Sequence, residues 1–479
     1  MSAASNNNDK PSLDRTLQEL HNCMDIFHRM FPGKPELHIV YFSNLVNMDR
    51  LHHDLVAPLA SAAGNEQIAA ILTQEHSLFV AAQDHHTCVN GILAGQAAVF
   101  FREEVYLIDL LNSFGRSIEQ SETETVIAGP HDGFVENITD NLTVIRRRIH
   151  SAQLKTISLQ VGEVTKTQVI VAYIEGIAND ELTNKLIERI RGIEIDAVFD
   201  TNMLVQMIDD NPNSVFPQFL TTERPDAICS KLTAGRVICL VDGSPSAFSC
   251  PTSFFEFFTS PDDYYQRWQL GTALRLLRII GFVVTIGFTA LYVSITTFHY
   301  EMVPHTMLLN LTESRSRVPF PPLYEALLME ITIELLREAG ARLPTKIGQT
   351  IGIVGGIVIG QAAVQAGFTS NILIIAVASS AIASFVIPSY IMSASIRLIR
   401  FGLILLAGLL GNFGLAAGIC FIVIHLSGIT NLGTSYLTPL APIAKKDWLD
   451  TFIRGPFYAL RSRPSQAQTS NKVKNKMRK

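Results

Sequence analysis

The sequence predicts a cytoplasmic α/β amino-terminal region of two units, followed by an α-helical integral membrane domain of about four spans, with five as the alternative. Three observations predict this class. Hydrophobic residues make up 48% of the 479 residues and charged residues only 17%, which is more apolar than the average soluble protein. Charged residues are absent from Ile347–Ile396, and Phe401–Ala444 holds only His425 as an ionisable group. Before about residue 260, short strand and helix patterns alternate instead.

The first α/β unit is indicated by a strand pattern and a hairpin pattern. The apolar run Leu37–Phe42 predicts a strand that is followed by a helical stretch through Leu59. The segment Ala97–Leu111 predicts a hairpin that turns at Arg102–Glu104. The preceding chain begins MSAASNNNDKPS and has no apolar core behind a basic cluster, so we expect a flexible tail and not a cleaved signal peptide.

The second α/β unit begins after the basic helix end IRRRI. A strand is predicted in TQVIVAYIEGIA, and NDELTNKLIERIRGI predicts an amphipathic helix capped by its Asn or Asp. The stretch GRVICLVDGSPSAFSC predicts a hairpin that turns at Asp242-Gly243, because Asp-Gly is a strong hairpin signal. The predicted organisation is 1–34 as a flexible tail and helix, 35–128 and 129–268 as the two α/β units, 269–444 as the transmembrane domain with an amphipathic helix at 321–340, and 445–479 as a basic cytoplasmic tail.

The membrane crossings follow from apolar runs of about 20 residues, the length that spans a bilayer. Ile279–Phe298 follows three arginines and predicts the first crossing, with its start in the cytoplasm. Ile372–Met392 predicts another crossing, which we expect to be kinked at Pro388, and Phe401–Leu426 predicts the last.

Topology remains open between two alternatives. Four crossings place both chain ends in the cytoplasm, but they leave Arg397 and Arg400 outside, against the positive-inside bias. A re-entrant segment at Ile347 or a fifth crossing within Ser427–Ala444 changes the count.

Glycines and glutamines mark Ile347–Gly367 as a helix that packs against protein. Small residues recur every four positions and allow another backbone to come close, namely Gly348, Gly352, Gly356 and Gly360. The adjoining stripe carries three amides that need partners or water within a membrane, namely Gln349, Gln361 and Gln365. Two interpretations fit: packing within one subunit, or a helix that lines an aqueous pore in a ring of identical subunits.

The helix predicted at 321–340 is rich in acids. Pro321 and Pro322 predict its start and Gly340 its end. One stripe is apolar, with Leu323, Leu327, Ile331 and Leu335, and another is acidic, with Glu330, Glu334 and Glu338. Arg337 and Arg342 can pair with Glu334 and Glu338 and offset part of the repulsion. Around a pore, these acids would form a negative collar that concentrates cations, whereas the alternative is a solvated helix face.

No catalytic constellation or metal site is predicted. The chain has no phosphate-binding loop, no G-x-G-x-x-G after a strand and no H-E-x-x-H, so we expect no enzyme activity and no cofactor. The clusters His52-His53-Asp54 and Asp84-His85-His86 could meet around a metal, but surface histidines are the commoner reading. The six cysteines show no C-x-x-C spacing, which fits a reducing compartment. From Lys445 onward, ten Lys and Arg face Asp447 and Asp450, which predicts either a tail near anionic lipid or a solubilising tail.

Five stretches together resemble the A subunit of the GerA-type spore germinant receptors, from about Gly129 to about Leu440. They are GPHDGFVENITDNLTVIRRRI, TERPDAICSKLTAGRVICLVDGSP, FFEFFTSPDDYYQRW, PFPPLYEALLMEITIELLREAGARLP and IVGGIVIGQAAVQAG. The resemblance implies a multi-pass protein of the spore inner membrane that acts in nutrient-triggered germination. It implies two partners, a transporter-like B subunit that binds the nutrient and a lipoprotein C subunit, and it implies assembly of A subunits into an ion channel. Membrane lipid is a further partner, and no nucleic acid is expected.

We therefore expect a receptor subunit that oligomerises and passes cations when a partner binds nutrient. The expected pore-lining residues are Gln349, Gln361, Val364 and Gln365, the expected packing residues are the four glycines, and the expected cation vestibule is Glu330, Glu334 and Glu338. The alternative is a non-conducting membrane scaffold that transmits a signal within the same receptor.

Overall fold

The computed structural model describes residues 10–31, 34–62, 64–73, 79–112, 124, 128–342, 355–356 and 358–477. The chain divides into two compact units. The first, here called the α/β unit, comprises Met1–Asp209, Phe219–Thr252 and Arg461–Lys479. The second, here called the helical unit, comprises Asp210–Gln218 and Ser253–Leu460. Each unit is described by itself.

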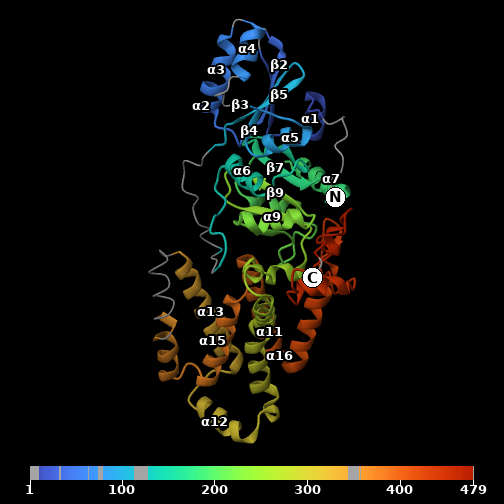
Figure 1. The fold of residues 1–479 in the computed structure, drawn as a ribbon. Coiled ribbons are helices and arrows are strands. Elements are labelled where there is room, and N and C mark those ends of the chain that lie inside the picture. Colours follow the sequence, from blue (N-terminus) through green and yellow to red (C-terminus); the bar gives the residue numbers. More distant parts are fainter. Residues whose placement is uncertain are drawn as a thin grey trace. The chain divides into compact units, whose positions relative to one another are not determined.

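The α/β unit contains two five-stranded antiparallel sheets (Figure 1). The first sheet has the order β1-β2-β4-β5-β3, with β1 Ile26–Phe31, β2 Lys34–Phe42, β3 Phe79–Ala81, β4 Gln96–Phe101 and β5 Glu104–Asp109. One face packs on α1 Leu13–Glu19 and α5 His85–Leu93. The other packs on the π-helical turn Leu51–Val56, α3 Ala57–Ser61 and α4 Asn65–Thr73, and the short α2 Met48–Arg50 precedes that turn. The predicted strand and the β4–β5 hairpin are confirmed, and Arg102 takes a positive φ of 54° in the turn.

The second sheet has the order β6-β7-β9-β10-β8, with β6 Leu154–Val161, β7 Thr167–Ile174, β8 Leu220–Thr222, β9 Val237–Val241 and β10 Ala247–Cys250. Helices α6 Ile138–Arg148 and α9 Pro225–Thr233 share one core with it. Helices α7 Asp180–Arg191 and α8 Thr201–Ile208 pack against β6 and β10. The predicted cap and hairpin are confirmed: Asn179 accepts from the amides of Glu181 and Leu182, and Gly243 has a φ of 82° between β9 and β10. Glycine suits that turn because a side chain disfavours positive φ.

The chain end Arg461–Lys479 belongs to the α/β unit, with the short turn Ser465–Ala467 inside it. The Ser470 amide donates to the Ile177 carbonyl at 3.3 Å, and Arg463 Nε donates to the Thr233 carbonyl at 3.1 Å. The stretch expected as a basic tail at 445–479 is therefore divided between the units. Its last part is held by the Arg463 side chain on α9 and by the Ser470 backbone on the loop before α7.

The helical unit is built on long helices that lie side by side (Figure 1). Its helices are α10 Asp262–Tyr265, α11 Trp268–Phe298, α12 His305–Arg315, α13 Pro322–Ala341, residues 355–356 and 358–365, α15 Asn371–Phe385, α16 Tyr390–Gly428 and α17 Trp448–Thr451. Short 3₁₀ turns lie at Phe254–Phe258, Tyr300–Met302 and Lys445–Asp447, and β11 Thr430–Asn431 pairs with β12 Thr434–Ser435. Among the described residues, α11 and α16 are long and apolar enough to cross a membrane, and α15 is a shorter apolar helix.

The predicted kink at Pro388 is wrong, because the helix breaks there. Helix α15 ends at Phe385 and α16 begins at Tyr390, where Ser389 accepts from the Met392 amide as the amino-terminal cap. Proline has no amide hydrogen and disfavours helix in the residue before it, so two helices form in place of one span. The kink lies instead inside α16 at Gly411, whose φ of 60° favours glycine.

Candidate functional site: the charged interior of the helical unit

Helix α13 confirms the predicted acid-rich helix almost residue for residue, but its faces are reversed. The side chains of Ile331 and Leu335 are exposed, whereas those of Glu325 and Glu330 are buried. Of the predicted apolar stripe, Leu323 and Leu327 are half-buried and its second half faces outward. An outward apolar face suits hydrocarbon, and acids inside a helical bundle can find partners there.

Glu330 forms a fully buried ion pair with Arg400, and both residues are 0% exposed. Arg400 Nη2 of α16 lies 2.7 Å from Glu330 Oε2 of α13. The Thr289 hydroxyl of α11 donates to Glu330 Oε1 at 2.9 Å, and Arg400 Nη1 donates to the Ser380 hydroxyl of α15 at 3.1 Å. The pair therefore lies where four helices meet. A buried pair offsets its desolvation cost only with such additional hydrogen bonds.

A second layer of charges lies about one turn along α13. Glu334 accepts from Arg397 Nε of α16 at 3.0 Å and lies 3.5 Å from Arg337 of its own helix. Arg397 and Arg337 also donate to the hydroxyls of Ser393 and Ser384, at 2.9 and 3.0 Å. The name interior ion cluster is used below for Glu330, Glu334, Arg337, Arg397 and Arg400.

The interior ion cluster bears on two predictions. In the four-span topology, Arg397 and Arg400 conflicted with the positive-inside bias; on α16 both side chains are buried in the helical unit and paired with acids. Glu330 was expected to attract cations at a pore mouth, but its carboxylate is buried and its charge is compensated. The predicted pairs of Arg337 with Glu334 and of Arg342 with Glu338 are confirmed, and the second lies at 2.6 Å on the exposed end of α13.

Glu325, one turn before Glu330, holds a different segment. Its Oε1 accepts from the Thr369 hydroxyl at 3.1 Å and from the Ser370 amide. The Tyr292 hydroxyl of α11 lies 2.9 Å from Ser370 Oγ, which also caps α15 by accepting from the Leu373 amide. Glu325 and Ser370 are 1% and 0% exposed. The turn at residues 369–370 is thus attached to both α13 and α11.

The helix that ends just before this turn carries the predicted pore and packing residues. Gln361 and Gln365 are exposed, and Val364 is half-buried. Gly356 is exposed, and a methyl group added to it would have no described atom within 4 Å, while one on Gly360 would be 4.0 Å from Ile374. Three of the predicted residues, Gly348, Gln349 and Gly352, lie outside the described residues. Of the two stripe glycines that are described, Gly356 is open and Gly360 is half-buried beside Ile374.

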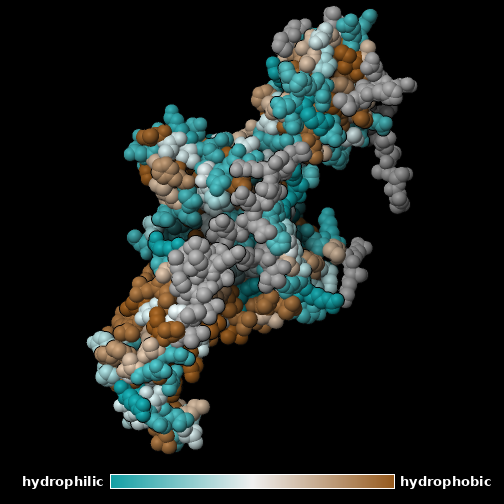
Figure 2. All heavy atoms as spheres, turned by 90° about the vertical axis from the view of Figure 1, so that its left-hand side faces the viewer, coloured by the Kyte–Doolittle hydropathy of each residue, from teal (hydrophilic) through white to brown (hydrophobic). Residues whose placement is uncertain are grey.

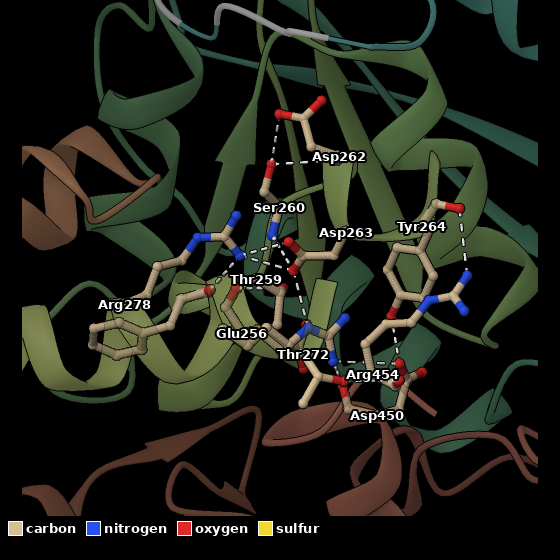
Figure 3. A network of polar contacts seen from close by, with 12 residues as sticks. Glu256, Thr259, Ser260, Asp262, Asp263, Tyr264, Thr272, Arg278, Asp450 and Arg454 are labelled. Carbon is tan, nitrogen blue, oxygen red and sulfur yellow. Dashed lines mark hydrogen bonds and ion pairs between the residues drawn. The ribbon is translucent and has the colours of Figure 1, made fainter. Parts of the chain in front are cut away.

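A further polar cluster fixes the start of α11 (Figure 3). Asp263, which is 0% exposed, accepts from Arg275 Nε at 2.9 Å and from Arg278 Nη1 at 2.8 Å. The Tyr264 hydroxyl donates to Asp450 at 2.6 Å, and burial together with Asp450 raises the pKa of Tyr264 well above its usual value. Arg275 and Arg278 were expected as cytoplasmic flanking charges, and here they tie α11 to the segments around it. The cluster of Asp263, Arg275, Arg278, Tyr264 and Asp450 is called the base cluster.

On the face drawn in Figure 2, apolar side chains gather over much of the helical unit, and its lower end is hydrophilic. Exposed side chains on α11 and α16 include Ile280, Val283, Leu409 and Phe413. Such a surface is typical of contact with lipid or with another protein. Among the described residues, no three His, Cys, Asp or Glu side chains group as metal ligands, and His85 pairs with Glu19 at 2.7 Å.

The arginine partners of α13 were missed by sequence reasoning. The sequence did contain a signal for these buried arginines, because Arg397 and Arg400 conflicted with the positive-inside rule in the four-span topology. Charges that violate this rule are explained when they pair inside the bundle with acids from another helix. Arg400 and Glu330 are 70 positions apart in the sequence, so spacing alone did not connect them.

The fold and this site define a membrane-associated protein in which an α/β unit is joined to an apolar helical unit with a charged interior. The family model described as "Bacillus/Clostridium GerA spore germination protein" matches residues 14–466, and the chain belongs to this family. The resemblance noted in the sequence is thereby confirmed.

Similar proteins carry the same family name. The chain is 42% identical to spore germination protein GerQA of Bacillus cereus over 89% of the chain and 86% of that protein. It is 35% identical to spore germination protein B1 of Bacillus subtilis (strain 168) over 98% of both chains. A crystal structure of the N-terminal domain of the A subunit of the Bacillus megaterium spore germinant receptor GerK3 covers 53% of this chain and 99% of that domain, with 25% identity and a TM-score of 0.39.

Proposed function

We propose that the chain is the A subunit of a nutrient germinant receptor of the spore inner membrane, and that several copies assemble into a ligand-gated cation channel. Its partners are a transporter-like B subunit that binds the nutrient and a lipoprotein C subunit. The helical unit crosses the membrane about four times, and both chain ends lie in the cytoplasm. Family membership supports the role in germination.

The open glycine face is the observation that carries the channel proposal. Gly356 lies on the surface with no described atom near its missing side chain. In lipid there is no hydrophobic driving force for helices to associate. A helix face of small residues therefore gains stability only by close packing against another helix. Gln361 and Gln365 are exposed on the same helix, and amides in hydrocarbon need a partner or water. A second copy and a water-filled path satisfy both requirements.

The acids that can form the proposed cation vestibule lie at the exposed end of α13. Glu338 is exposed and Glu334 is one-third exposed, so these two carboxylates can still bias the approach of cations. Glu330 is not part of the proposed vestibule, because it is buried against Arg400.

The oligomeric mass of the full chain in detergent tests the proposed assembly. Gly356→Leu places a bulky side chain on the open face, and we expect it to reduce the oligomer to smaller species in multi-angle light scattering. Gly402→Leu on α16 is the matched control, because a side chain there also meets open space. Equal masses for both variants and the native chain would remove the glycine face from the assembly. An intact oligomer that passes no cations favours the alternative, a non-conducting scaffold of the same receptor.

A further inference from the structure

We propose that Glu325 and Glu330 are positioning residues that make α13 a link between the α11–α16 pair and the glycine-bearing helix, whose described residues are 355–356 and 358–365. Glu330 fixes α13 on α16, and Glu325 fixes the turn that ends the glycine-bearing helix. The consequence for ion passage rests on the proposed channel function, whereas the positioning itself does not.

The first step is that α11 and α16 form the fixed part of the helical unit. The base cluster ties the start of α11 through Asp263, which pairs with two buried arginines. Close packing continues along α11: a methyl group on Gly281 would lie 3.2 Å from the Ala383 carbonyl of α15, and Ser294 donates to Asn412 of α16 at 2.7 Å. Contacts this tight leave little room for sliding between these helices.

The second step is that Glu330 sets the register of α13 on this pair. An apolar contact tolerates a shift along the helix, but the Glu330 carboxylate is satisfied only where Thr289 and Arg400 both reach it. A shift by one helical residue, about 1.5 Å, would leave a buried charge without its partner. Buried polar groups specify geometry in this way more than they add stability.

The third step is that α13 contacts the first described residue of the glycine-bearing helix and the turn that follows its last residue. At the far end, Glu325 Oε1 holds Thr369 and Ser370, immediately after that helix. At the near end, a methyl group on Gly355 would lie 3.2 Å from Leu336 Cδ2 of α13. The Tyr292 hydroxyl of α11 also lies 2.9 Å from Ser370 Oγ, so the turn is attached to both α11 and α13. Loss of the Glu325 carboxylate therefore removes one of two attachments of this turn and should widen the range of positions of the helix that precedes it.

The test is a distance measurement on the full chain in lipid nanodiscs. Ala362 of the glycine-bearing helix and Leu409 of α16 are both exposed. Spin labels at these two positions report the distance between the two helices by double electron–electron resonance. Cys420, the exposed cysteine, is first replaced by Ser. Labelled chains are diluted with unlabelled ones so that only distances within one subunit contribute.

Two substitutions remove the links while respecting packing. Glu325→Ala deletes the acceptor for the turn, whereas Glu325→Gln keeps an oxygen in that place. Glu330→Met with Arg400→Met replaces the pair by apolar side chains of similar size, a change that folded proteins tolerate. Glu330→Arg with Arg400→Glu restores the pair in reverse. Glu313→Gln, on the exposed surface of α12, is the control for removal of a charge.

We expect a narrow distance distribution in the native chain, in Glu325→Gln, in the reversed pair and in the control. Glu325→Ala and the double Met variant are expected to broaden it and to reduce nutrient-broth-triggered rubidium efflux on the order of tenfold, as for typical coupling between sites. The proposal is overturned if these two variants keep the native distribution, or if the reversed pair behaves like the double Met variant. If the native receptor releases no rubidium, only the channel function is contradicted. The positioning role of Glu325 and Glu330 is still tested by the measured distances.

Discussion

Asp25 and Arg146 form the most enclosed ion pair of the α/β unit. Arg146 Nε and Nη2 donate to the two oxygens of Asp25 at 2.8 and 2.7 Å, and Nη1 donates to the Leu154 carbonyl at 3.0 Å. The guanidinium also lies over the Phe42 ring, 4.5 Å from its centroid. Asp25 precedes β1 and Arg146 belongs to α6, so one bidentate pair joins the two sheets.

Replacement of Asp25 by Asn should lower the free energy of unfolding by about 3–5 kcal/mol, because it leaves Arg146 buried without its counter-charge. Urea unfolding of the full chain in detergent, followed by far-ultraviolet circular dichroism, measures this free energy of unfolding. Glu103→Gln is the control, since Glu103 pairs with Lys10 at 3.8 Å on an exposed surface and should contribute less than about 1 kcal/mol. Equal effects of the two changes would show that the Asp25 pair does not join the sheets energetically.

The buried face of helix α13 is the opposite of the one that its sequence pattern would bury in water. In water, its acids would face solvent and Ile331 and Leu335 would face the core. In the helical unit the apolar residues face outward, and Glu325 and Glu330 face helices that supply Thr, Ser and Arg partners. The same inversion appears on α16, where Arg397 and Arg400 are buried and Leu398 is exposed. Both helices therefore fit a bilayer and not an aqueous surface.

Cys420 on α16 tests whether this outward face meets lipid. Among the cysteines, Cys420 is exposed, and the other five are buried in the α/β unit. Burial raises the pKa of Cys229 and of Cys250 to about 12, so neither is available as thiolate. We expect a charged maleimide to leave all six thiols unmodified in open native membranes and to modify all six in denaturing detergent, as counted by mass spectrometry.

The control for reagent access is Glu103→Cys, at a position exposed in the α/β unit, which should be modified in native membranes. Modification of Cys420 before denaturation would mean that this face of α16 is in contact with water, and it would contradict the membrane placement of the helix.

Local signals in the sequence were sufficient for several elements of the α/β unit and for the bounds of α13, but not for β1 Ile26–Phe31, which lies where a flexible tail and helix were expected. Asn179, Gly243 and the Pro321-Pro322 pair act within a few residues of themselves, so their structural effect can be predicted locally. The interior ion cluster could not be predicted in this way, because its partners come from helices far apart in the chain. Pro388 signalled a disturbance of the helix but not whether it would be a kink or a break, and the kink at Gly411 had not been predicted.

For the assembled receptor, the structure leaves the glycine-bearing helix open on one side and attached to α13 on the other. That arrangement suits a helix that contacts neighbouring copies while its own subunit controls its position. Val364 is half-buried on this helix, between the exposed Gln361 and Gln365. If these residues surround an ion path, the size of the side chain at Val364 sets its width.

Rubidium efflux from vesicles that contain the complete receptor, triggered by nutrient broth, measures ion passage through this path directly. We predict that the native receptor releases rubidium, that Val364→Trp reduces the initial rate on the order of tenfold or more by blocking the path, and that Val364→Ala does not, all at unchanged oligomeric mass. An identical rate for Val364→Trp and the native receptor, or no efflux from correctly assembled native receptors, would contradict a conducting ring built on this helix.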